Sequence, residues 1–251
     1  MNIEYLIEEE NRVALESLNA YSDVIRNTEN IIALLNQIVY IQNEQATAFY
    51  CLNKNSQHGL YQCLLSLLRR HDVQAQLMLR HAMETACLAV YSLHNTSLEN
   101  YIVNDEFGSK PVKPIKDKAY NWIHKHYPEM SDKLKVAKSL INDFYAHGNL
   151  FASLISLTRR NDGVDIIDYF DRKRDGITQT AQIWKVGYIA CIIFILIYET
   201  AKTSEAVNVN LEIYSQFKTL LAESQELRLS FIAEKRFEKL YKHLANATVK
   251  G

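Results

Sequence analysis

The sequence predicts an all-α fold, a single helical-bundle domain with a central buried helix. The 251 residues include only 7 Gly and 3 Pro, whereas a β-sandwich or barrel needs a turn about every eight to twelve residues. Hydrophobic residues make up 48% of the chain, which is enough for one substantial core. Apolar residues also recur at helical spacing along most of the sequence.

The first part of the chain predicts long helices. Residues 2–52 contain neither Gly nor Pro, and one long helix, or two joined near residues 27–30, accounts for their apolar periodicity. The sequence KNSQHG at 54–59 predicts a turn. Residues 60–93 are again helical, with a break at His71 and Asp72, where Asp72 can cap a new helix.

The middle of the chain holds the clearest loop. Residues 104–118 contain two of the three prolines and one glycine, which is typical of a loop that faces a partner. Helices are expected at 117–125 and 131–157, the second with Ser131 as its N-cap. An Asn-Asp-Gly turn at 161–163 predicts at most one small β-hairpin, near residues 155–170.

The most apolar run is residues 186–198, which is shorter than the ~20 residues that span a bilayer. It predicts a helix over 178–202 that is buried on all sides. Residues 205–247 carry an apolar stripe at helical spacing and predict a further long helix. We therefore expect one domain, residues 1–251, with a core at about 55–202 and peripheral helices at 2–52 and 205–247.

The composition indicates the cellular compartment of the protein and limits the kinds of partner that it can bind. A formal net charge of -1 provides no overall basic field to attract nucleic acid. The four cysteines lie far apart in apolar helical stretches, as expected of reduced, packed thiols. The acidic start of the chain does not resemble a signal peptide. These features predict a cytoplasmic protein without a membrane segment.

Two polar clusters interrupt otherwise apolar helices: Arg80 with Glu84, and Asp143 with His147. The members of each pair are four residues apart and share a helix face. Because buried charges need partners, we expect the four side chains to meet inside the fold. Arg80 either reserves part of its guanidinium for a phosphate or carboxylate ligand, or pairs with Glu84 to tie two helices together.

The second cluster has the residue types of a general acid or base. Asp143 can hold the His147 imidazole in one tautomer and raise its basicity. Asn142 and Tyr145 add hydrogen-bonding groups beside it. The structural interpretation is that His147 donates to a facing helix and Gly148 allows close packing.

No cofactor signature occurs in the sequence. Eight histidines are present, but HExxH, paired ExxH and CxxC motifs are absent, so no metal site is predicted. Glycine-rich phosphate loops and a GxSxG nucleophile motif are absent as well. We therefore predict no cofactor.

Two short elements resemble known helical proteins. Arg80 and Glu84 form Arg-x-x-x-Glu, and Tyr145, His147 and Gly148 form Tyr-x-His-Gly. Together, over about residues 55–200, these elements resemble a broad group of uncharacterised bacterial helical proteins.

More distantly, NDFYAH at 142–147 is similar to the Arg-x-x-x-x-His element of the HEPN superfamily, with Asn142 at the arginine position. The resemblance implies a helical dimer, and many members of that superfamily cleave RNA without a metal. In that family the arginine and histidine of two subunits face a shared cleft.

Two classes of function follow from these features. The first is a non-catalytic helical interaction module of a stress or defence system, a homodimer formed through an exposed apolar stripe of a terminal helix, with a protein partner. The alternative is a HEPN-like, metal-independent ribonuclease that uses His147 as acid or base. Asp143 would orient His147, Asn142 and Tyr145 would hold the phosphate of RNA, and Arg80 would balance charge. A third interpretation is a pocket in which Arg80 and His147 bind a small anion.

Overall fold

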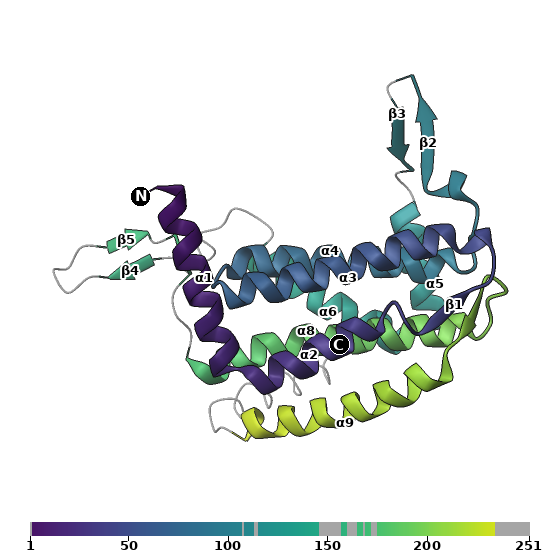
Figure 1. The fold of residues 1–251 in the computed structure, drawn as a ribbon. Helices are drawn as coiled ribbons and strands as arrows, with labels where there is room; N and C mark the ends of the chain where they lie inside the picture. The colour runs from purple at the N-terminus through teal and green to yellow at the C-terminus, as the bar shows by residue number, and fades with distance from the viewer. Residues whose placement is uncertain are drawn as a thin grey trace, which may run out of the picture.

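The computed structural model describes residues 2–106, 108–112, 115–145, 157–159, 165–167, 169–171 and 175–233. Figure 1 shows long helices lying side by side, with short strand pairs at the edges of the bundle. Within these ranges there are eight α-helices and three two-stranded antiparallel ladders. The all-α class is therefore confirmed.

Helices α1 (Ile3–Ala20) and α2 (Ser22–Leu34) meet at Tyr21, not near residues 27–30 as the sequence had indicated. The expected joint is wrong because Asn27 is buried in the middle of α2, where its Nδ2 donates to the carbonyl of Leu220 at 3.0 Å. A polar residue that seemed to mark a break instead ties α2 to a distant helix.

Helices α3 (Thr47–Leu68) and α4 (Asp72–Ser92) lie against each other along their length (Figure 1). The turn expected at 54–59 is wrong, since these residues lie inside α3. A Cβ atom at Gly59 would lie 3.1 Å from the Cβ of Ala82, so this glycine lets two helices approach closely. The break before α4 is confirmed, with Arg70 at a φ of 58°.

Segment 98–145 contains η2 (Leu98–Asn100), β2 (Ile102–Asp105), β3 (Gly108–Pro111), α5 (Ile115–His126) and α6 (Pro128–Phe144). Strands β2 and β3 form a ladder that projects from the bundle (Figure 1). Part of the expected loop at 104–118 is thus a strand pair, whose turn has Gly108 at a φ of 112°. The expected N-cap Ser131 is wrong, since α6 begins at Pro128 after Tyr127 and Ser131 is buried inside it. The expected helix end at residue 157 is also wrong, because Leu157 lies in a strand; residues 146–156 lie outside the described residues.

Strands β4 (Leu157–Arg159) and β5 (Asp165–Ile167) form the hairpin predicted near 155–170. A third ladder joins β1 (Val39–Ile41) to β6 (Val207–Val209), after the short η1 (Glu44–Ala46) and before α9 (Leu211–Ile232). The described residues thus contain two further strand pairs besides the predicted hairpin. Each strand of the third ladder has three residues and its partner is remote in sequence, so local alternation gave no signal.

Helix α8 (Gly176–Ala201) is the predicted central helix and contacts α2, α3, α4, α6 and α9. Phe194 of α8 stacks on Phe217 of α9, with ring centroids 3.9 Å apart. Helix α8 is long and apolar enough to cross a membrane, and 61% of its most apolar window is buried within the fold.

Helix α2 is part of the core, which corrects the expectation that residues 2–52 are peripheral. Ile31 and Ile32 are fully buried and belong to one continuous hydrophobic cluster, to which α2, α3, α4, α5, α6, α8 and α9 all contribute. The cluster joins both halves of the chain in one packed unit.

Candidate functional site

A group of charges joins α4, α5 and α6, and we name it the Glu84 cluster: Arg80, Glu84, Lys116 and Lys138. Arg80 Nε donates to Glu84 Oε1 at 3.1 Å. Lys138 Nζ lies 3.2 Å from the same oxygen, and Lys116 Nζ lies 2.6 Å from Glu84 Oε2. One carboxylate thus holds cations from three helices.

The Glu84 cluster is partly exposed and carries two positive charges in excess. The exposed fractions of its side chains are 20% for Glu84, 25% for Lys138, 30% for Arg80 and 39% for Lys116. Burial alone would raise the pKa of Glu84, but the contacts with Lys116, Arg80 and Lys138 outweigh it and lower the pKa below its usual value. Glu84 therefore stays ionised at neutral pH.

The inner side of the cluster is less polar. Lys138 Nζ lies 4.5 Å from the ring centroid of Tyr120, a cation–π contact. Burial raises the pKa of the adjacent Cys87 to about 12, so this thiol is not a nucleophile. The four cysteines are free, and Cys51 is exposed rather than packed as expected.

The sequence-predicted residues fall into two sets. Arg80 and Glu84 contact each other, as described above. Asp143 is exposed, so the expectation that it lies inside the fold is wrong. His147 and Gly148 lie outside the described residues, so a meeting of His147 with Arg80 and Glu84 stays a prediction. Lys116 and Lys138 were not anticipated, because no spacing in the sequence relates them to Glu84.

The end of α6 carries the other candidate residues. Asn142 lies one turn after Lys138 on the same helix face. Its Oδ1 is buried and has no hydrogen-bond partner within the described ranges. Asp143 is exposed and accepts a hydrogen bond from Ser139 Oγ at 3.3 Å, and Tyr145 is the C-cap residue of α6.

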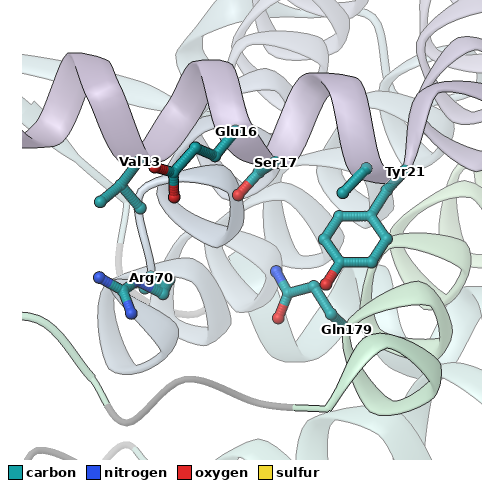
Figure 2. A pocket seen from close by; sticks show the side chains of 7 residues that line it. Val13, Glu16, Ser17, Tyr21, Arg70 and Gln179 are labelled. Atoms are coloured by element: carbon teal, nitrogen blue, oxygen red, sulfur yellow. The ribbon is translucent and has the colours of Figure 1, made fainter.

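A small cavity lies between α1, the α3–α4 turn and the start of α8 (Figure 2). Its volume is about 100 Å³, below the ~300 Å³ of small ligand pockets. Ser17 Oγ donates to the carbonyl of Leu68 at 2.9 Å, and Gln179 Nε2 donates to the carbonyl of Leu67 at 3.0 Å. These two hydrogen bonds attach α1 and α8 to the end of α3, so the cavity is part of the packing between these helices. Its lining residues are Val13, Glu16, Ser17, Ala20, Tyr21, Arg70 and Gln179.

A histidine that sequence reasoning treated only as a helix break lies beside this attachment. His71 Nε2 lies 3.1 Å from Glu10 Oε1, and the Tyr169 hydroxyl donates to the same oxygen at 2.7 Å. The hydrogen bond from Tyr169 lowers the pKa of Glu10. His71 also stacks on Phe170, with centroids 5.6 Å apart. Within the described part of the chain, no group of His, Cys, Asp and Glu side chains has the arrangement of a metal site.

The outer side of α1 carries four large exposed apolar side chains, with Glu4 and Asn11 on the same side. We name it the α1 stripe: Ile3, Ile7, Leu15 and Leu18. The exposed fractions of these residues are 69%, 53%, 61% and 41%. Spacings of four, eight and three residues bring them to one side of the helix. Helix α1 itself buries only Val13 and Ser17.

Comparisons of the chain with protein-family models, with curated proteins and with solved structures found no match.

Proposed function

We propose that this protein works by association, as a homodimeric helical module in which the α1 stripe binds a basic amphipathic helix of a second copy. The α1 stripe is the observation that carries the proposal. Most of the stability of a helix in a protein comes from packing of its apolar face, and α1 buries only two of its residues. Burial of each large apolar side chain in an interface would contribute ~1.5–3 kcal/mol.

The charge of α1 favours a basic partner. The helix contains one arginine, Arg12, and five glutamates. Two α1 helices packed on each other would bring carboxylates together, which is unfavourable. A helix with lysines beside an apolar face complements both the charge and the stripe.

Residues 234–251 of the same chain have this composition. They contain five Lys or Arg and two Glu, and Phe237, Leu240, Tyr241 and Leu244 share one helix face. No Gly, Pro, Asn or Asp occurs between residues 211 and 245, so the sequence itself carries no helix-stop signal before this segment. Helix α1 lies at a steep angle to α9 (Figure 1).

Analytical ultracentrifugation of the full chain over a range of concentrations tests the proposal. We expect a dimer for the wild type, and monomers for Leu15→Glu and Leu244→Glu, because each places a carboxylate in the apolar contact. Leu211→Glu is the matched control, since Leu211 is 69% exposed on α9 outside both contact faces. It should remain dimeric.

A wild type that stays monomeric at high concentration would overturn the homodimer. A dimer that survives both Leu15→Glu and Leu244→Glu would overturn the assignment of the α1 stripe. A monomer in which Leu244→Glu exposes α1 to proteolysis would show instead that the C-terminal segment binds α1 of its own chain, which also contradicts the proposal.

A second candidate function is metal-independent cleavage of RNA, with His147 as general acid or base, Asp143 to orient it, and Asn142 and Tyr145 at the phosphate. The observation in its favour is the Glu84 cluster, whose excess positive charge includes Lys138, one turn before Asn142 on α6. A cationic group at this distance along the helix would stabilise charge on a phosphodiester.

Replacement of His147 by alanine tests this second function. We expect His147→Ala to abolish cleavage of a labelled single-stranded RNA while the melting temperature stays unchanged. His81→Ala is a matched control, because His81 is an exposed histidine of α4. Equal cleavage by both variants, or a large fall in melting temperature without activity in either protein, would contradict the catalytic role.

A further inference from the structure

We propose that the Glu84 cluster is a binding site for a phosphoryl group, in which Arg80, Lys116 and Lys138 contact the oxyanion and Glu84 positions the three cations. The inference goes beyond association through α1, because the site lies on α4, α5 and α6. It holds whether or not the protein acts on RNA.

Charge balance is the first argument. One lysine is enough to neutralise Glu84, yet three cations contact it at 2.6 to 3.2 Å. Neighbouring cations repel one another, and partial burial strengthens that repulsion. A group of this kind is stabilised when an anion supplies the missing negative charge. The excess of two charges matches a phosphate dianion.

The donors are the second argument. Arg80 contacts Glu84 through Nε alone, and among the described residues its two Nη nitrogens make no hydrogen bond. These nitrogens form a planar edge that matches two oxygens of a phosphate. Each lysine ammonium has three donor hydrogens, so Lys116 and Lys138 retain donors after contacting Glu84.

Preorganisation is the third argument. Exposed lysines are ordinarily mobile, and ordering them opposes binding. Here Glu84 fixes both lysines, and the Tyr120 ring lies 4.5 Å from Lys138 Nζ. The exposed fractions of 25% to 39% for the three cations leave them open to solvent on one side. The cations are therefore held in place and accessible together.

Titration calorimetry of the full chain with inorganic phosphate at about pH 8, where phosphate is mostly the dianion, tests the site at constant ionic strength, and sodium acetate titrated in the same way is the control anion. We expect saturable binding by the wild type and affinity at least ~10-fold weaker for Arg80→Gln and Lys116→Gln, which each lose one charge-assisted contact. Lys133→Gln is the matched control, because Lys133 is a lysine of α6 that pairs with Glu129 outside the cluster. It should bind phosphate as the wild type does.

Glu84→Gln separates a ligand site from a purely structural ion-pair group. The substitution keeps an amide oxygen that can accept from Arg80 and Lys138 at the position of Oε1, and it adds one positive charge to the cluster. Phosphate should therefore bind more tightly and raise the melting temperature by more than in the wild type. Far-UV circular dichroism establishes that each variant is folded. Lys116→Gln is the variant that should disturb the fold least, because Lys116 is the most exposed of the three cations. The proposal would be overturned if the wild type showed no saturable binding of phosphate, or if Arg80→Gln and Lys116→Gln bound phosphate as tightly as the wild type. It would also be overturned if acetate bound as tightly as phosphate.

Discussion

Glu84 connects three helices through one side chain, because each of its two oxygens accepts contacts from cations on α4, α5 or α6. The sequence identified the residue as a charge in an apolar helix. Its importance in the folded protein comes from Lys116 and Lys138, which are remote from it in sequence. The residue is therefore the best single position at which to measure how charge stabilises this fold.

We expect Glu84→Gln to lower the free energy of unfolding by ~1–3 kcal/mol at pH 7, since charged hydrogen bonds are lost from a half-buried site. The cation contacts hold the pKa of Glu84 below its usual 4.5 in the fold. The stabilisation is therefore present above pH 4.5 and is lost as the pH falls through the lower, folded-state value.

Urea unfolding of both proteins at pH 7 and at pH 3 measures this loss. The difference between wild type and Glu84→Gln should shrink at the lower pH. Glu212→Gln, at an exposed position of α9, controls for the general effect of removing a carboxylate. A difference that is the same at both pH values would contradict the ionic role of Glu84.

At the scale of elements, α4 begins with an unusual cap. The side chain of its N-cap residue, His71, makes no capping hydrogen bond, and the carboxylate of Asp171 accepts from the backbone N–H of Asp72 instead. The backbone N–H of Asp171 donates to the carbonyl of Arg70 at 2.9 Å. Asp171 thus satisfies the start of a helix that lies about one hundred residues earlier in the chain.

We expect Asp171→Ala to destabilise the protein by ~1–2 kcal/mol, the usual cost of removing a helix cap. Asp171→Asn should destabilise it less, because the amide oxygen still accepts from Asp72 N–H and no longer repels the Asp72 carboxylate. Burial raises the pKa of Asp171, in keeping with a charge that is partly unfavourable there. Thermal unfolding at pH 7 compares the two variants. Equal effects would show that the negative charge, rather than the acceptor, matters.

At the scale of the whole molecule, one hydrophobic cluster includes residues from seven helices, α2 to α6, α8 and α9. The β1–β6 ladder also joins residues 39–41 to residues 207–209. These long-range contacts predict that the chain unfolds as one unit rather than as two halves.

Two tryptophans report on different parts of that unit. Trp122 lies on α5, and Trp184 of α8 donates its Nε1–H to the carbonyl of Ser224 at 2.9 Å. We expect fluorescence of Trp122→Phe, fluorescence of Trp184→Phe and far-UV circular dichroism to give unfolding curves whose midpoints agree with one another within each protein. A separate, earlier transition seen only through Trp122 would show that α5 unfolds independently.

The sequence by itself determined the all-α class, the buried central helix, the break before α4 and the pairing of Arg80 with Glu84. These depend on composition, on periodicity and on contacts four residues apart, which are local properties of a helix. The hairpin at β4–β5 was also predictable, because the sequence Asn-Asp-Gly, a strong turn signal, lies between its strands in the chain.

Only the tertiary structure decided which local signals were overridden. Gly59 and Asn27 looked like breaks, but contacts with Ala82 and with the Leu220 carbonyl keep them inside helices. The core position of α2, the β1–β6 ladder and the two lysines at Glu84 likewise join residues that are far apart in the chain. Such contacts depend on how complete helices pack, and no spacing within a single segment encodes them.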